Sequence, residues 1–129
     1  MSDSKQVFRS GIYKDYFAQG IKTGNTLHLA GQVGIDTEGN IPESIADQTK
    51  LAYDNIQQVL SEFNATMENI VDETIFVTDM SDTMKNVENI FSVRAQAYGA
   101  IPEVSQTLVQ VVALVSPKLK IEIKCIAHL

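Results

Sequence analysis

Apolar and polar residues alternate most clearly near the C-terminus, between Leu119 and Ala127. The odd-numbered positions of this stretch are apolar: Ile121, Ile123, Cys125 and Ala127. The even-numbered positions include Lys120, Glu122 and Lys124. Successive side chains of a β-strand point to opposite faces of a sheet, so this pattern predicts a strand over residues 119–127 with one buried face.

Residues 104–114 are rich in β-branched side chains and predict another strand directly before this one. Ser116 and Pro117 separate the two strands, and we expect them to pair as a hairpin. Residues 104–114 carry apolar side chains on both faces, and such a strand is normally covered on both sides. Because the chain predicts few helices, we infer that a partner subunit provides one of the covers.

Three further strands are expected in the N-terminal part of the chain. Residues 6–8 predict a short edge strand. Residues 16–22 and 26–30 flank the turn sequence Thr-Gly-Asn, and we expect them to form another hairpin. Gly31 and Gly34 follow, and they allow a neighbouring chain or a ligand to approach closely, although this spacing alone does not indicate a phosphate site.

Two amphipathic helices are predicted from apolar residues that recur three and four positions apart. The first runs from about Ser44 to Asn64, and its apolar stripe consists of Ile45, Ala52, Ile56, Val59, Leu60 and Phe63. The second follows the capping residues 79–82 and ends near Tyr98, before Gly99. Its expected stripe consists of Met84, Val87, Phe91, Ala95 and Tyr98.

Between the helices, residues 71–78 predict a strand. Its positions Val71, Glu73, Ile75 and Val77 share one face. The predicted order is β-β-β-α-β-α-β-β, an α+β fold in which two helices cover one face of a mixed sheet with about six strands. The other face would stay apolar and open, so we expect the protein to associate as a small cyclic oligomer.

Length and charge limit the function further. At 129 residues the chain has the size of one domain, spanning 1–129. Ten Lys plus Arg against sixteen Asp plus Glu give a formal net charge of −6, which argues against a nucleic-acid partner. The N-terminus lacks the apolar core of a signal peptide, and no segment has the apolar length of a membrane span. We therefore expect a cytoplasmic protein without a membrane partner.

Metal sites and nucleophilic sites find no support in the sequence pattern. His28 and His128 are the only histidines, and no Cys/His cluster accompanies them, so we expect no metal. Cys125 lies on the apolar face of its predicted strand and has no evident base nearby, which indicates a buried and unreactive thiol. Walker and dinucleotide-binding motifs are absent from the sequence.

Glu122 is the residue with the clearest chemical potential. It occupies the middle of the predicted strand 119–127 and projects to the face that we assign to a partner subunit. A carboxylate in such a cleft would be partly desolvated, which raises its pKa and suits it to proton transfer or water activation. The alternative is a cross-strand ion pair with Lys120, Lys124 or a lysine of another subunit.

Motifs spread over nearly the whole chain resemble the YjgF/RidA proteins, which are also called the L-PSP endoribonuclease family. These motifs are Phe17-Ala-Gln-Gly20, Leu29-Ala-Gly-Gln32, Ala52 with Asn55 and Ile56, Ile75-Phe-Val-Thr-Asp79, Pro102, and Ile121-Glu-Ile123 with Ala127. The resemblance implies a chorismate-mutase-like α+β fold and a homotrimer with small-molecule clefts between subunits. It also implies hydrolysis of reactive enamines and imines to keto acids and ammonia, without a cofactor.

The resemblance further implies which residues form the site. Glu122 matches the family's carboxylate, which helps to position the attacking water. Where active members carry an arginine that binds the substrate carboxylate, this chain has Val104, which offers neither charge nor side-chain donor. A tyrosine of the family aligns with Phe17, and a small hydroxyl residue aligns with Ala30. The expected substrate-binding residues are Phe17, Ala30, Gly31, Val104 and Gln106, and the expected catalytic residue is Glu122.

Two functions from different classes agree with these expectations. The first is an enzyme that acts on an imine, an enamine or a related small carbonyl compound, including compounds without a carboxylate. The second is a non-catalytic trimer that binds a small apolar or neutral metabolite, because Val104, Phe17 and Ala30 make the expected cleft less polar. A ribonuclease comes third, since the acidic charge of the chain argues against it.

Overall fold

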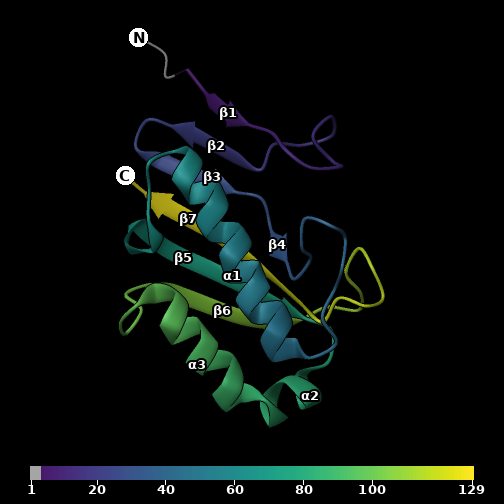
Figure 1. The fold of residues 1–129 in the computed structure, drawn as a ribbon. Coiled ribbons are helices and arrows are strands. Elements are labelled where there is room, and N and C mark those ends of the chain that lie inside the picture. The colour runs from purple at the N-terminus through teal and green to yellow at the C-terminus, as the bar shows by residue number, and fades with distance from the viewer. Residues whose placement is uncertain (1–3) are drawn as a thin grey trace.

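In the computed structural model, which describes residues 4–129, helices cover one face of a mixed seven-stranded sheet (Figure 1). The strands are β1 (Gln6–Phe8), β2 (Gly20–Thr23), β3 (Thr26–Leu29), β4 (Gln32–Val33), β5 (Ile70–Val77), β6 (Ser105–Gln110) and β7 (Ile121–His128). The helices are α1 (Ile45–Glu62), α2 (Met80–Lys85) and α3 (Val87–Tyr98), and a short 3₁₀ turn spans Met67–Asn69. The predicted α+β architecture is therefore present.

The main path of the sheet runs β1-β2-β3-β7-β5-β6, and the short strand β4 pairs with β7 beside it. The predicted edge strand β1 and the predicted pairing of β2 with β3 are both confirmed, but β2 begins at Gly20 and not at residue 16 as predicted. Gly24 in the hairpin turn has a φ of +55°, a conformation that glycine adopts without steric cost. Strand β4 has only two residues, and the sequence pattern did not predict it.

The predicted hairpin between residues 104–114 and 119–127 is wrong. Strand β5 lies between the two segments, because β6 pairs with it in parallel and β7 pairs with it antiparallel. The cause is the helical connection from β5 through α2 and α3 to β6, which is long enough to join parallel neighbours. Residues 111–120 connect the end of β6 to the start of β7 and belong to neither strand.

Strand β7 has the predicted two faces. The side chains of Ile121, Ile123, Cys125 and Ala127 are buried in the core. Leu27 and Leu29 of β3 and Ile75 and Val77 of β5 belong to the same core, beneath Tyr53, Ile56 and Leu60 of α1. Glu122 and Lys124 therefore point to the face of the sheet that is turned away from the helices.

Helix α1 begins where the sequence predicts. Ser44 caps it, and its side chain accepts a hydrogen bond of 3.0 Å from the backbone N–H of Asp47. The helix lies close to the strands at Gly34, where an added Cβ would come within 2.6 Å of the Cα of Gln48. Glycine at this position thus allows the close approach of helix and sheet.

The second predicted helix is interrupted, so its expected apolar stripe is wrong. Asp79 caps α2 as predicted, but the helix ends at Asn86 and α3 starts directly afterwards. Thr83 and Ile90 are the buried residues of the two helices, whereas Met84 is 51% exposed. The break turns the two parts relative to each other, so a single stripe does not describe both.

Strand β5 contains a β-bulge that corrects another expectation. Its register shifts between Ile70 and Asp72, which leaves Val71 exposed instead of on the predicted common face. Glu73, Ile75 and Val77 do share the buried face. The glutamate is consequently enclosed between the sheet and the helices.

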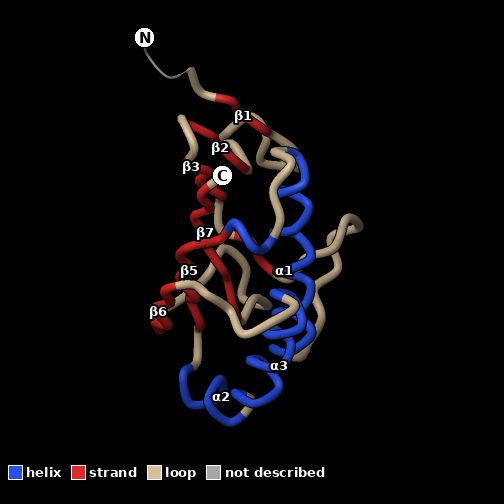
Figure 2. Tube along the Cα trace, turned by 90° about the vertical axis from the view of Figure 1, so that its left-hand side faces the viewer, coloured by secondary structure: helices blue, strands red, loops and turns tan. Residues whose placement is uncertain are grey.

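The opposite face of the sheet carries no helix within residues 4–129. Figure 2 views the molecule from the side, with the strands at the left, α1 and α3 to their right, and α2 below the sheet. Each of these helices is also too short or too polar to span a bilayer. The partner subunit expected on the open face remains a prediction, which we take up with the proposed function.

Candidate active site

A cleft of about 620 Å³ opens beside Glu122. Its walls come from the loop after β1, from β4 and the segments on either side of it, from the loop before β7, and from β7 itself. The lining residues are Ser10, Gly11, Ile12, Tyr13, Phe17, Gln19, Ala30, Gly31, Gln32, Val33, Ile35, Asp36, Thr37, Gly39, Val115 and Glu122. We refer to this space as the Glu122 cleft.

The cleft brings together four of the residues that the sequence predicts for the site. Phe17, Ala30, Gly31 and Glu122 all line it. Val104 and Gln106 do not line it within one chain. Val104 precedes β6 and packs against the core. The side chain of Gln106 points toward the helices, where its amide donates a hydrogen bond of 3.0 Å to Glu73.

Glu122 sits where β4 and β5 flank β7, opposite Val33 on one side and Phe76 on the other. Its side chain is half-buried, and within the described chain no hydrogen bond or ion pair reaches the carboxylate. Burial raises the pKa of Glu122, and the charge of Lys124 offsets part of that rise. The carboxylate is thus available to a ligand and more basic than an ordinary glutamate.

The alternative expectation for Glu122, an ion pair with a lysine of its own strand, is not found in residues 4–129. Lys124 directs its ammonium group to the backbone oxygen of Leu29 instead, at 2.9 Å. The two ion pairs that occur in this part of the chain are Lys50–Asp54 and Arg94–Glu73. Both lie away from the Glu122 cleft.

Gly31 leaves room for the Glu122 carboxylate. A Cβ built on Gly31 would overlap the carboxylate oxygen and would lie 2.8 Å from its carbon. Real Cβ atoms do not approach other heavy atoms so closely, so any larger residue would displace the glutamate side chain. The absence of a side chain at Gly31 therefore leaves the space that the carboxylate occupies, and this gives the predicted site residue a specific role.

Two amides form a polar wall beside Gly31. The side-chain amide of Gln32 donates to the side-chain oxygen of Gln19 at 2.7 Å and to the backbone oxygen of Ala30 at 3.2 Å. Because the oxygen of Gln19 is an acceptor in this pair, its NH₂ group remains available to a ligand. Both glutamines belong to the motifs that carry the family resemblance, although the sequence analysis did not assign them to the site.

Helix α1 holds the far wall of the cleft in place. The amide of Asn55 donates to the backbone oxygens of Val33 and Ile35 at 2.9 and 3.0 Å. Gln48 joins the helix to the segment before β7, since its side chain bonds to the backbone of Lys118 and Lys120. The side-chain amides of α1 thus form hydrogen bonds with backbone groups of the segments beside the cleft, and these bonds connect the segments to the core.

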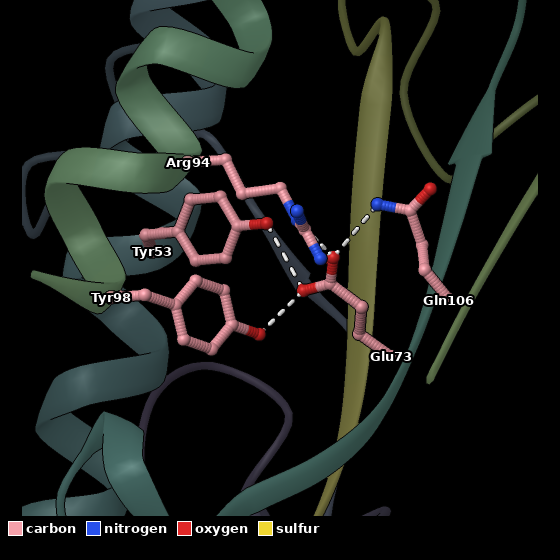
Figure 3. Close-up of polar contacts among 5 residues, drawn as sticks. All are labelled: Tyr53, Glu73, Arg94, Tyr98 and Gln106. Atoms are coloured by element: carbon pink, nitrogen blue, oxygen red, sulfur yellow. Dashed lines mark hydrogen bonds and ion pairs between the residues drawn. The ribbon is translucent and has the colours of Figure 1, made fainter. Parts of the chain in front are cut away.

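A second polar cluster lies on the helix side of the sheet (Figure 3). Glu73 is fully buried and accepts hydrogen bonds from Tyr53 at 3.1 Å, Tyr98 at 2.7 Å, Gln106 at 3.0 Å and the guanidinium of Arg94. These five residues, which we call the Glu73 cluster, join α1, α3, β5 and β6. The sequence analysis placed Glu73 on the same face as Ile75 and Val77 but did not identify its partners.

Within the Glu73 cluster, Arg94 balances the negative charge of Glu73, and the three neutral donors reach the same carboxylate. Burial and the adjacent Glu73 charge raise the pKa of both tyrosines, so they remain neutral donors. Burial opposes the charged form of Arg94, but its hydrogen bond to Glu73 and the charge of Glu73 outweigh this effect, and the pKa of Arg94 is raised. All donors point at one carboxylate, which suits a structural connection.

The other titratable groups offer little chemistry. Cys125 is fully buried, and burial raises the pKa of its thiol, which agrees with the predicted unreactive cysteine. Among the described residues, no group of histidine, cysteine and acidic side chains has the arrangement of a metal site. Glu122 is therefore the reactive group that the cleft presents.

Comparisons with known proteins agree on one family. The model of the family described as endoribonuclease L-PSP matches residues 12–129. The chain is 30% identical over 133 residues to the RutC family protein YjgH of Escherichia coli K12, an alignment that covers 100% of this chain and 98% of that protein. It is 33% identical over 115 residues to Reactive Intermediate Deaminase A, chloroplastic, of Arabidopsis thaliana, with coverage of 88% and 58%.

A solved structure confirms the fold. The crystal structure of a member of the YjgF/YER057c/UK114 family from Mycobacterium tuberculosis has a TM-score of 0.82 to this chain and 29% sequence identity. The match covers 98% of this chain and 100% of that one. The expected family resemblance and the expected α+β fold are thus both confirmed.

Proposed function

Because this chain belongs to the endoribonuclease L-PSP family, we propose that it hydrolyses small reactive imines or enamines in the Glu122 cleft. The observation that carries this proposal is the half-buried Glu122 carboxylate, which forms no hydrogen bond or ion pair within residues 4–129 and whose pKa burial raises. One relative carries the name Reactive Intermediate Deaminase A, which supports the same reaction type. The proposed reaction converts an imine and water to a carbonyl compound and ammonia.

In the proposed mechanism Glu122 acts first as a base and then as an acid. Its carboxylate removes a proton from water while the water oxygen bonds to the imine carbon, and the C=N electron pair moves to nitrogen. The protonated Glu122 then gives its proton to that nitrogen. The Glu122 carboxylate next takes the proton of the new hydroxyl group and passes it to the nitrogen, so that the C–N bond breaks, ammonia leaves and the carbonyl forms without a cofactor. The role proposed for Gln19, which lines the cleft, is to donate a hydrogen bond from its NH₂ group to the oxygen of the attacking water.

The proposed assembly is a homotrimer in which copies of the chain cover the open face of the sheet. Glu122 and the cleft lie on that face, so a neighbouring copy would enclose the bound substrate and could add residues such as Val104. Sedimentation equilibrium should give three times the 14.2 kDa of one chain. A stable monomer at micromolar concentration would contradict the proposed trimer.

A second candidate function is the binding of a neutral or apolar metabolite without catalysis. It is favoured by the apolar side chains that line the cleft, among them Ile12, Phe17 and Val115. A thermal-shift screen would then find a stabilising ligand, whereas no imine would be turned over. If the rate of imine turnover rises in proportion to the protein concentration, the protein is an enzyme and the function of binding without catalysis is refuted.

Gly31→Ala tests the proposed enzyme, because its Cβ would take the place of the Glu122 carboxylate. We expect imine hydrolysis, measured as ammonia release above a protein-free blank, to fall about tenfold while the protein stays folded. If Gly31 acts through Glu122, the substitution should cost little further activity in a Glu122→Gln background. Absence of turnover by the wild type across a panel of imines would refute the proposed function.

A further inference from the structure

The side chains that line the Glu122 cleft carry negative charge and no positive charge. Two carboxylates, Glu122 and Asp36, are among them, whereas the lining residues within the described chain include no lysine, arginine or histidine. Hydrogen bonds from the backbone N–H groups of Asn40 and Glu38, at 2.8 and 2.9 Å, lower the pKa of Asp36. Asp36 therefore stays charged at neutral pH.

Two basic residues that are close in sequence to lining residues, Lys124 and Arg9, donate to backbone oxygens. Lys124 donates to the backbone oxygen of Leu29 at 2.9 Å, and Arg9 donates to the backbone oxygen of Lys14 at 3.0 Å. The chain as a whole has a formal charge of −6. A negatively charged ligand would thus enter a negative field without a counterion, whereas a cation would be attracted.

The remaining surface of the cleft is apolar and partly aromatic. Ile12 and Val115 are 82% and 72% exposed, and an apolar ligand would remove part of their surface from water. Tyr13 and Phe17 stack with ring centroids 5.6 Å apart. Aromatic faces attract cations as well as hydrocarbon groups, so this wall suits a ligand that combines the two.

We propose that the Glu122 cleft selects cationic ligands with a hydrocarbon or aromatic body and no carboxylate. If the proposed function holds, on which this reading of the substrate rests, the substrate is an iminium ion that a primary amine yields on oxidation. The balanced reaction is R–CH=NH₂⁺ + H₂O → R–CHO + NH₄⁺. The step that supplies this substrate must be an amine oxidation, and a step that consumes aldehydes must follow.

Binding of three probes with the same ring tests this selection without any turnover. Benzylammonium, benzyl alcohol and benzoate carry a positive, a neutral and a negative head group, and calorimetry at low salt measures each of them against the intact protein. We expect benzylammonium to bind about tenfold more tightly than benzoate, with benzyl alcohol between them. Equal affinities, tighter binding of benzoate, or no binding of any probe would overturn the proposal.

A pair of variants in one loop provides the control. Val115→Lys adds a cation to the lining of the cleft and should reverse the order of benzylammonium and benzoate. Val112→Lys adds the same charge at a fully exposed position that does not line the cleft, and it should preserve the wild-type order. If both variants behave alike, the selection does not arise in the cleft.

Kinetics separate this proposal from the proposed function. Hydrolysis of imines with and without a carboxylate at equal kcat/KM would leave the enzyme in place and refute the selection. Conversely, the expected order of the three probes without hydrolysis of any imine would support the selection and refute the enzyme. Only a protein that prefers benzylammonium and hydrolyses carboxylate-free imines faster satisfies both.

Discussion

Glu122→Gln should lower the rate of imine hydrolysis by a factor of roughly 10² to 10⁴, which is the usual contribution of a general acid–base group. The amide is nearly isosteric with the carboxylate, so it preserves the shape of the cleft but cannot accept a proton from water. Burial disfavours the charge of Glu122 in the folded state. The variant should therefore be at least as stable as the wild type at neutral pH, and this separates lost activity from lost folding.

The pH dependence of kcat/KM tests the role of Glu122 in a second way. Since the base form of Glu122 is needed, kcat/KM of the wild type should rise with pH through a pKa above the ordinary glutamate value of 4.5. The residual activity of Glu122→Gln should lack this rise. The raised pKa also means that the folded state binds more protons than the unfolded state in this range, so Glu122 lowers stability as the pH increases.

Glu88→Gln is the matched control for this experiment. Glu88 is an exposed glutamate in the first turn of α3, on an element that does not line the Glu122 cleft. Its substitution removes the same charge and should leave both the rate and the pH profile as in the wild type. Equal rates for Glu122→Gln and the wild type would remove Glu122 from the mechanism.

Arg94→Met should reduce the free energy of unfolding by about 3 kcal/mol, the lower end of the range for breaking a buried ion pair. The side chains of Arg94 and Glu73 are 13% and 0% exposed, so the variant leaves a carboxylate buried without its cation. Three neutral donors in the Glu73 cluster remain, which limits the loss. A decrease in Tm of roughly 10 °C should be observed at constant protein concentration.

An exposed ion pair supplies the control for Arg94. Lys50 and Asp54 lie 3.2 Å apart on α1 with side chains that are 68% and 51% exposed. Lys50→Met should therefore change stability by no more than about 0.5 kcal/mol. Adding Glu73→Gln to Arg94→Met removes the buried charge and should recover part of the stability. A double variant less stable than Arg94→Met alone would contradict this account of the Glu73 cluster.

Local patterns in the sequence predicted several elements correctly, although they missed β4 and the break between α2 and α3. The alternation of Ile121, Glu122 and Ile123 identified a strand and its two faces, and Ser44 identified the start of α1. The pairing of strands was harder to predict, because it depends on contacts between distant segments. Nothing in residues 104–127 alone shows that β5 separates the two strands.

The polar sites were likewise predicted only in part. The family motifs indicated Phe17, Ala30, Gly31 and Glu122, and all four line one cleft. The Glu73 cluster was missed because the break at Asn86 changes which face of α3 meets the sheet. One signal was available: a glutamate between buried residues requires a cation, and Arg94 is the only basic residue in α3.

Strand β7 occupies the middle of the sheet although it is the last of the seven strands in chain order within residues 4–129. Until β7 emerges from the ribosome, β3 and β5 have no neighbour at the positions that it fills, and the nascent chain presents two unpaired edges that can join other chains. The sheet therefore cannot be completed before β7 has been synthesised. Polypeptides truncated before Ile121 should require chaperones or accumulate as aggregates.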